Sequence, residues 1–438
     1  MRPITLSLIL LATAAPAAAQ SVRLDAQRAA DMAVDASHLS QAAADRVRAT
    51  ESAVEAADAA RLPVLTAAAG VAQVNNIPEF SAPVNGPDQP PTVIFPNITT
   101  WYQADLSVTQ PLYTGGGITA GRDVARMDND QASWAAARTA LDLRFSARGY
   151  YWKAIAAAAA VEVAMAQQRR ADRLLEDTRA LRDAGMAVDA DVYAGQARVA
   201  ASQVDIIRAQ TEKERTLAEL RSLLALSPET EIVLADAGTD AVPPLPQALT
   251  ELQAQALAGR PELKIADARI GGLGARARAV DAARMPSVAL SGQWLLARPN
   301  QRFLPLEDVW NDSWRVGVAA SWQLFDGNRT RAEAATVRAE QEAVRADRGE
   351  LERQVKLQVE TARLELEAAI DAIEAADASR RSAAAWEESS KERYAAGLAS
   401  ISEMLDAQAD LTAAEVAQVR ARVAAWLAAV TLERAVGK

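Results

Sequence analysis

Apolar and polar residues alternate in two segments of the chain, 101–113 and 314–325. In the first segment the apolar set is Tyr102, Ala104, Leu106, Val108 and Leu112, and the polar set is Gln103, Asp105, Ser107 and Thr109. In the second, Trp314, Val316, Val318, Ala320, Trp322 and Leu324 alternate with Arg315, Ala319, Ser321 and Gln323. A period of two places alternate side chains on opposite faces of a strand. Both segments are therefore predicted strands with one apolar and one polar face.

Each of these strands has a predicted partner earlier in the chain, at 62–74 and 285–296. The runs are about 10–12 residues long, which suits a tilted strand that crosses a bilayer. Aromatic residues cluster near the strand ends, as at membrane interfaces: Trp101, Tyr102, Tyr113, Trp310, Trp314, Trp322 and Phe325. A soluble sandwich hairpin remains the alternative, because alternation does not say whether lipid or protein covers the apolar face.

Long helical patterns follow both strands. Between Gly121 and Arg182 there is no proline and only one further glycine, Gly149, which predicts a helix of roughly 90 Å. Residues 329–396 carry an apolar stripe at helical spacing: Leu351, Val355, Val359, Ala362, Leu366, Ile370 and Ile373. A further helix is predicted over 26–60, before Pro63. Such lengths indicate coiled-coil hairpins rather than helices of one globular core.

The two halves of the chain repeat each other at one constant offset in sequence. Tyr113 matches Phe325, Gly185 matches Gly397, and Gln196 matches Gln408, with no insertion between them. Upstream, residues 61–63 match 284–286 at a larger offset, because the first copy is longer between its two strands. Gly185 and Gly397 are each expected to cap the end of a long helix. A repeat of this length indicates duplication of a half-protein.

These patterns divide the chain into eight predicted segments. They are a signal peptide over 1–19, an N-terminal helical segment over 20–61, a first barrel hairpin over 62–113, a first helical hairpin over 117–236, a linker over 237–250, a helical segment over 251–284, a second barrel hairpin over 285–326 and a second helical hairpin over 327–438. The signal peptide is predicted from Arg2, the apolar stretch 4–15 and the small residues at 17–19.

Composition restricts the chemistry further. The chain has no cysteine, which excludes disulfides, thiolate metal sites and a lipidated cysteine anchor. The net charge of −10 argues against a nucleic-acid partner. His38 is the sole histidine, and Gly115-Gly116-Gly117 is not followed by the Lys-Ser/Thr of a phosphate-binding loop. No catalytic constellation can be assembled, so we expect neither an enzyme nor a cofactor.

Four strands do not enclose a water-filled pore, because about 8 strands only fill their own interior with side chains. A barrel built from these hairpins therefore requires several copies of the chain, and three copies supply 12 strands. The predicted fold class is an α+β membrane protein. Each protomer contributes four strands to a 12-stranded trimeric β-barrel and two long antiparallel helical hairpins to a tunnel, with an internal two-fold repeat.

Short motifs in a specific order resemble the outer-membrane efflux protein family of TolC-like exit ducts, over essentially all of the mature sequence. The motifs are Val108-Thr109-Gln110-Pro111-Leu112-Tyr113 with Gly115-Gly116-Gly117, Arg260-Pro261-Glu262-Leu263, Trp322-Gln323-Leu324-Phe325-Asp326-Gly327, and the two turns 184–196 and 394–408. The resemblance implies a homotrimer in the Gram-negative outer membrane, with a large periplasmic portion. Implied partners are a periplasmic adaptor (membrane fusion) protein, an inner-membrane pump of the RND or ABC type, and outer-membrane lipid.

The resemblance also implies a narrow periplasmic end lined by acidic residues. Glu403 and Asp406 occupy the matching positions after the second turn, and Asp191 is the one acidic match after the first. Tyr394 is the candidate closed-state latch, and the turns at Gly185 and Gly397 are the expected adaptor-docking tips. In some relatives an arginine follows the second glycine by two residues, but here that position is Ala399.

The resemblance implies a passive conduit for efflux or type I secretion. The alternative from another class is a soluble periplasmic coiled-coil adaptor or scaffold, against which the doubled hairpins argue. Detergent dependence distinguishes the two. The cargo is set mainly by the pump, so the chain itself carries little information about it.

Overall fold

The computed structural model describes residues 21–84, 86, 89–235 and 241–438, so the predicted signal peptide lies outside the described residues. The elements in chain order are β1 Ser21–Leu24, α1 Ala26–Ala36, α2 His38–Ala59, β2 Val64–Gln73, β3 Phe80–Ala82, β4 Thr92–Phe95, β5 Thr100–Tyr113, α3 Gly117–Asp183, α4 Asp189–Leu223, β6 Glu231–Leu234, α5 Leu249–Gly259, α6 Pro261–Ala282, β7 Ser287–Arg298, β8 Asn311–Ser321, α7 Arg329–Ala395 and α8 Ile401–Val436. They form two compact units, a helical unit (described residues 21–43, 136–235, 241–261 and 351–438) and a strand unit (described residues 44–84, 86, 89–135 and 262–350).

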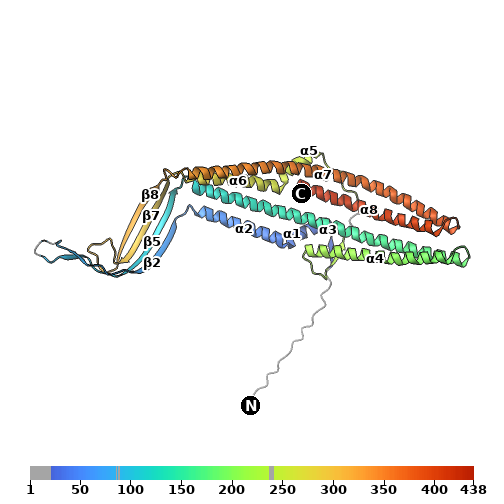
Figure 1. Cartoon of the computed structure of the whole chain (residues 1–438), viewed down its shortest axis with the longest axis horizontal. Coiled ribbons are helices and arrows are strands. Elements are labelled where there is room, and N and C mark those ends of the chain that lie inside the picture. Colours follow the sequence, from blue (N-terminus) through green and yellow to red (C-terminus); the bar gives the residue numbers. More distant parts are fainter. Residues whose placement is uncertain (1–20, 85, 87–88, 236–240) are drawn as a thin grey trace, which may run out of the picture. The chain divides into compact units, whose positions relative to one another are not determined.

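The strand unit is organised around one antiparallel sheet in the order β2-β5-β7-β8, whose strands lie side by side in Figure 1. Its register aligns residues of like character in two adjacent cross-strand rows. One cross-strand row is Thr66, Ser107, Gln293 and Arg315, and the adjacent row on the opposite face is Ala67, Leu106, Trp294 and Trp314. The sheet therefore has one polar and one apolar face, as the alternation predicted.

The apolar face of this sheet is uncovered within the chain. Val71, Val316 and Trp314 are 67%, 65% and 68% exposed. A contiguous exposed apolar surface on a folded protein marks a contact with a partner or with lipid. The two outer strands, β2 and β8, each pair with only one neighbour among the described residues, so both edges of the sheet retain unpaired backbone groups.

The second predicted strand is shorter than its sequence pattern. β8 ends at Ser321, and Trp322, Leu324 and Phe325 follow it at 60%, 78% and 82% exposure. The reason is the length of its neighbour: Ser321 pairs with Ser287, the first residue of β7. The strand prediction for 322–325 is wrong for the isolated chain, because no backbone partner is present there.

The N-terminal segment also differs from the prediction of one helix over 26–60. α1 and α2 are separated at Ser37, whose backbone is extended (φ −79°, ψ 127°) and whose Oγ accepts a hydrogen bond from the backbone N–H of Leu39 at 3.1 Å. Serine competes for backbone groups in this way and favours helix ends. Before α1, the short strand β1 pairs in parallel with β6, so the predicted helical segment over 20–61 includes an unpredicted strand.

The later helical segment over 251–284 is likewise divided. α5 begins at Leu249, inside the predicted linker, and Arg260 separates it from α6, which starts at Pro261. Proline at a first helical position loses no hydrogen bond, since that N–H has no acceptor in the helix. Residues 237–240 of the predicted linker lie outside the described residues, as does residue 236 just before it.

The helical unit has a core in which α3 contacts β1, α1, α4, β6 and α8. Tyr151 is 1% exposed and donates its hydroxyl to the Ala235 carbonyl at 3.1 Å, and Trp152 stacks on Trp426 with ring centroids 4.8 Å apart. The aromatic residues fix α3 against α8 by both burial and stacking. α3 and α7 have the same length, 67 residues, and their first and last residues occupy matching positions in the two halves of the chain.

Within the described residues, no helix combines the length and the apolar character that a membrane-spanning helix requires.

Candidate functional site

The two helical hairpins turn through the same backbone motif. At the end of α3, the N–H of Gly185 donates to Arg182 O at 2.9 Å and that of Met186 donates to Leu181 O at 2.8 Å. At the end of α7, Gly397 N–H donates to Tyr394 O at 2.9 Å and Leu398 N–H donates to Arg393 O at 2.8 Å. The glycines adopt φ values of +76° and +71°, which is the Schellman motif. The prediction that both glycines cap long helices is confirmed.

Tyr394 lies in a small apolar cluster near the second turn. It is 7% exposed and packs among Leu174, Ile401 and Met404, so α3, α7 and α8 all contribute to the cluster. Its hydroxyl lies 3.0 Å from Oγ1 of Thr178, which is fully buried on α3. Thr178 donates its only hydroxyl hydrogen to Leu174 O at 2.7 Å. Tyr394 is therefore the donor and Thr178 the acceptor.

The Tyr394 phenol remains neutral at physiological pH. Burial raises its pKa above the usual value near 10, and the nearby carboxylates of Asp191 and Asp177 add to this, while the hydrogen bond to Thr178 partly opposes it. Because the raised value favours the neutral form in the folded protein, the contribution to stability is complete below pH 10. It is lost as pH rises through the raised value. Ionisation of Tyr394 therefore does not weaken the contact between α3 and α7 between pH 5 and 8.

Thr178→Val is expected to loosen this contact more than Tyr394→Phe. Valine leaves the buried Tyr394 hydroxyl without its acceptor, at about 1–3 kcal/mol. With phenylalanine, Thr178 still donates to Leu174 O. Hydrogen exchange of backbone amides in the last two turns of α3 and α7 measures the difference, with a roughly tenfold acceleration for Thr178→Val. Thr178→Ser, which keeps the hydroxyl, is the control. A larger effect from Tyr394→Phe than from Thr178→Val would contradict the assignment of donor and acceptor.

The three acidic candidates occupy different environments. Glu403 is the third residue of α8: its backbone N–H donates to Oγ of the capping residue Ser400 at 3.2 Å, and its carboxylate forms an ion pair with Arg393 of α7. Asp191 is the third residue of α4 and accepts from the N–H of Val188 at 3.3 Å. Asp406, one turn beyond Glu403 on the same helix face, is exposed.

Helix capping accounts for part of this arrangement. Ser400 and Glu403 form the S-x-x-E pattern of a helix start, a signal present in the sequence that the acidic-constriction interpretation did not use. Carboxylates in a first turn are also favoured by the helix dipole. Asp406 has neither role, and in the described part of the chain its carboxylate has no hydrogen bond or ion pair.

Sequence reasoning missed an ion pair beside Tyr394. Arg170 on α3 donates from Nη1 and Nη2 to the two carboxylate oxygens of Glu415 on α8, at 3.2 and 2.8 Å, and from Nη2 to Thr412 Oγ1 at 3.1 Å. Both charged side chains are largely buried, 12% and 21% exposed. Arg170 and Tyr394 border one groove of about 490 Å³ between α3, α7 and α8. Arg170 and Glu415 lie far apart in the sequence, in different halves of the chain, so no local pattern reveals the pair.

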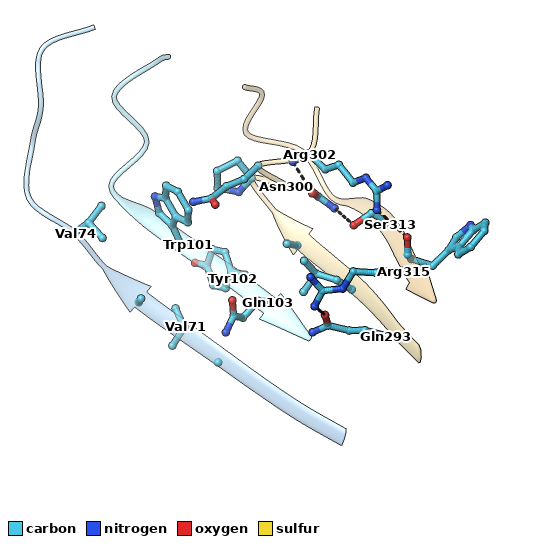
Figure 2. A pocket seen from close by; sticks show the side chains of 17 residues that line it. Val71, Val74, Trp101, Tyr102, Gln103, Gln293, Asn300, Arg302, Ser313 and Arg315 are labelled. Atoms are coloured by element: carbon cyan, nitrogen blue, oxygen red, sulfur yellow. Dashed lines mark hydrogen bonds between the residues drawn. The ribbon is translucent and has the colours of Figure 1, made fainter. Parts of the chain in front are cut away.

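Another groove, of about 570 Å³, lies on the polar face of the sheet in the strand unit (Figure 2). Arg315 donates from Nη2 to Gln293 Oε1 at 2.8 Å across β8 and β7, and Asn300 donates to Ser313 Oγ at 3.2 Å. Arg302 donates to the Trp314 carbonyl at 2.7 Å. Amides, hydroxyls and guanidinium groups line the groove together with apolar side chains such as Trp101 and Leu295, so this face of the sheet is of mixed polarity and carries hydrogen-bonding groups that can contact water. Within the described residues, no cluster of His, Asp or Glu side chains is arranged to hold a metal ion.

The fold and the site define a class of protein: two helical hairpins with matching turns, and a four-stranded sheet that has an uncovered apolar face and a polar one. Residues 17–226 and 252–438 match the sequence profile of the outer membrane efflux protein family. The chain belongs to the outer membrane efflux protein family.

Named relatives support this assignment. The chain is 24% identical over 354 residues to the pyoverdine export outer membrane protein OpmQ of Pseudomonas putida, an alignment that covers 77% of this chain and 71% of the relative. It is 29% identical over 348 residues to the protein CyaE of Bordetella pertussis, covering 73% of this chain and 68% of that relative.

Solved structures share the fold. The outer-membrane channel OprN superimposes with a TM-score of 0.75 at 21% identity, over 94% of this chain and 89% of OprN. CusC gives 0.78 at 17% identity, over 94% and 92%, and the outer membrane protein VceC of Vibrio cholerae gives 0.75 at 18% identity, over 94% and 96%. At such identities the likeness establishes the fold alone.

Proposed function

We propose that this protein is a passive outer-membrane conduit, through which a tripartite efflux or type I secretion system passes its cargo to the exterior. The observation that carries the proposal is the sheet of the strand unit: an exposed apolar face suited to lipid, a face with hydrogen-bonding groups suited to a water-filled lumen, and two free edges. Free edges are not tolerated in hydrocarbon, so such a sheet enters a membrane only as part of a closed barrel.

Closure by three copies gives a barrel of 12 strands and a homotrimeric protein. The groove of Figure 2 then belongs to the hydrated lumen. The helical hairpins form the periplasmic tunnel, and their turns at Gly185 and Gly397 are the surfaces to which a periplasmic adaptor docks. Met186 and Leu398, which follow the two glycines, are 66% and 72% exposed and present apolar contacts at both turns. An inner-membrane pump supplies the energy.

The narrow end of the tunnel is the proposed gate. The hydrogen bond between Tyr394 and Thr178 holds α7 to α3 and serves as the closed-state latch. Glu403, Asp406 and Asp191 surround the constriction in this proposal, where three copies place their carboxylates around one axis. Because Glu403 is paired with Arg393, the uncompensated negative charge of the proposed constriction comes from Asp406 and Asp191, which have no such ion pair in the described part of the chain.

A liposome-swelling assay tests the proposed function. The purified protein requires detergent for extraction, and in liposomes without any energy source it admits small solutes, at a rate that rises with the number of copies per vesicle. The scaffold alternative predicts a protein that is soluble without detergent and leaves liposome permeability unchanged. Either of these two results would overturn the conduit.

Asp406→Asn is expected to lower the preference of the pore for cations at least twofold. The substitution removes three negative charges from the proposed axis and leaves the Arg393–Glu403 pair intact, so the electrostatic effect is isolated from the loss of an ion pair. Reversal potentials across a bilayer with a KCl gradient measure the preference. Glu251→Gln, which removes the same charge from the exposed first turn of α5, is the control. Equal reversal potentials in wild type and Asp406→Asn would place the constriction elsewhere.

A further inference from the structure

The groove on the polar face of the sheet has an apolar floor (Figure 2). In the sheet register, Ala72 lies opposite Trp101 and Gly70 lies opposite Gln103. These two small residues leave space open beside the Trp101 ring, and all four residues line the groove. The indole N–H of Trp101 donates to the Ile98 carbonyl at 2.9 Å. Because that is its only hydrogen-bond donor, the indole presents an apolar ring surface to the groove.

Two arginines reach the same groove, Arg315 from β8 and Arg302 from the loop that joins β7 to β8 (Figure 2). Arg315 donates from Nη2 to Gln293 Oε1 at 2.8 Å, and Arg302 donates from Nη1 to the Trp314 carbonyl at 2.7 Å. Both acceptors are neutral, so each guanidinium keeps its full charge and most of its five N–H donors. Among the described residues, neither arginine forms an ion pair.

The groove is locally cationic on a chain whose net charge is −10. Among the described residues that line it, Arg302 and Arg315 carry charge and none is Asp or Glu. Asp308, in the same loop as Arg302, is engaged by Arg298. Asp105 lies in the cross-strand row next to that of Arg315, but two strands away from it. The two guanidinium groups are therefore the dominant charges of the groove.

The loop that carries Arg302 is held in place by its own hydrogen bonds. Asn300 is 2% exposed; its Oδ1 accepts from the backbone N–H of Arg302 at 3.0 Å, and its Nδ2 donates to the Asn311 carbonyl at 3.0 Å. Farther along the loop, Arg298 donates from Nε and Nη2 to the two carboxylate oxygens of Asp308, at 2.9 and 3.0 Å. A backbone fixed in this way loses little conformational entropy when its exposed arginine binds a ligand.

We propose that this groove binds a small aromatic anion, a carboxylate, sulfonate or phosphate joined to a ring. Arg302 and Arg315 hold the acidic groups, since guanidinium groups bind such oxygens through charge-assisted and often bidentate hydrogen bonds. The ring lies on the apolar floor beside Trp101, where aromatic stacking adds to burial. A volume of about 570 Å³ is within the range of small-molecule sites. The proposal rests on the proposed function, because the groove faces a lumen only in a closed barrel, and it names a class of solute for that lumen.

The position of the groove favours a water-soluble anion over the acidic headgroup of a lipid. Gln293 and Arg315 belong to the polar row of the sheet, whereas Trp294 and Trp314 belong to the apolar row on the opposite face. The face suited to lipid is therefore not the face that carries the groove. The ligand reaches the two arginines from water.

Calorimetric titration of the purified full-length protein in a matched detergent buffer tests the proposal. The probe is naphthalene disulfonate, whose two charges keep it out of the micelles. Two comparison compounds separate its features: propane disulfonate has the charges without the ring, and dihydroxynaphthalene has the ring without the charges. We expect naphthalene disulfonate to bind more tightly than either comparison compound, with an affinity that falls as salt is added.

Arg302→Gln and Arg315→Gln are each expected to weaken binding of naphthalene disulfonate roughly tenfold, because each removes one charged donor group. Trp101→Phe keeps an aromatic ring of smaller area and is expected to weaken binding less. Arg284→Gln is the matched control, since it removes the same charge from an exposed position before β7, at the opposite end of that strand. Only variants that unfold at the wild-type temperature are compared.

The outcomes separate the site from the proposed function. Equal affinity for propane disulfonate would overturn the aromatic class of ligand, and an equal loss in Arg284→Gln would reduce the effect to general charge attraction. Absence of binding, or binding unchanged in both arginine variants, would overturn the site, while liposome swelling still supports the conduit. Binding that requires both arginines, in a protein that is soluble without detergent and leaves liposomes intact, would retain the site and overturn the conduit.

Discussion

Gly115→Ala is expected to prevent most of the protein from folding, so that only a small fraction of the wild-type amount is recovered in folded form. Gly115 lies between β5 and α3 with φ +61°, and an added Cβ would lie 2.4 Å from the Cβ of Met285 and 2.8 Å from the carbonyl oxygen of Ala282. The carbonyl belongs to the backbone and cannot rotate away. Left-handed backbone alone costs a non-glycine residue about 1–2 kcal/mol, and the overlap brings the loss of stability above about 4 kcal/mol, the range of severe substitutions. The amount of protein in the membrane fraction and its thermal unfolding in detergent measure the effect.

The adjacent glycine is a matched control. Gly116 also has positive φ, +87°, but an added Cβ would meet no atom within 4 Å. Gly116→Ala is therefore expected to cost only the backbone strain, about 1–2 kcal/mol, and to fold. Similar losses from the two variants would show that the close approach to Met285 and Ala282 does not constrain the turn.

Glu415→Ala has the second largest expected effect, a loss of about 2–3 kcal/mol. Alanine leaves the largely buried guanidinium of Arg170 without its carboxylate, and Thr412 Oγ1 remains as its hydrogen-bond acceptor. Removing one partner costs more free energy than the intact pair contributes to stability, because the remaining ion is still desolvated and has no counter-charge. Thermal unfolding of the detergent-solubilised protein measures the loss, and Glu415→Gln, which retains an acceptor, is expected to lose less.

A double variant distinguishes the free-energy cost of the unpaired arginine from the stabilisation that the intact ion pair provides. Arg170→Met combined with Glu415→Leu removes both charges and retains the volume, and it is expected to be nearly as stable as the wild type. A double variant as unstable as Glu415→Ala would show that the ion pair itself, rather than the desolvated arginine, determines the effect.

The spacing of apolar and polar residues in the sequence predicted those helices and strands whose packing partners are present in the same chain. The polar and apolar faces of β5 and β8 follow from the alternation of single residues, and the ends of α3 and α7 follow from Gly185 and Gly397. The early end of β8 at Ser321 depends instead on where β7 begins, which the alternation of β8 does not encode. β1 escaped prediction because so short a strand cannot establish a period, and its partner β6 lies on the far side of α3 and α4 in the sequence.

In the candidate site, too, local sequence patterns predicted some residues, whereas others come together only through the packing of distant segments. Tyr394 was identified by resemblance to the family, but its acceptor Thr178 lies in the other half of the chain, and only the packing of α3 against α7 brings the two together. Ser400 and Glu403 are a local pattern and were predictable as a helix start. Ser37 was not assigned as a break, because an alanine-rich sequence continues on both sides and helix propensity alone favours a single helix.

Single-channel conductance in planar bilayers tests the central claim most directly, that this chain forms an outer-membrane duct held shut at its helical turns. Wild-type protein is compared with Thr178→Val under identical conditions, and Thr178→Ser is the control. We expect a small wild-type conductance and a channel that conducts more, or opens more often, when the acceptor of the Tyr394 hydroxyl is removed. In the serine variant the conductance is expected to be unchanged. Failure of correctly folded, detergent-extracted protein to insert and conduct would contradict the duct itself, and equal conductance in all three proteins would contradict closure at Tyr394.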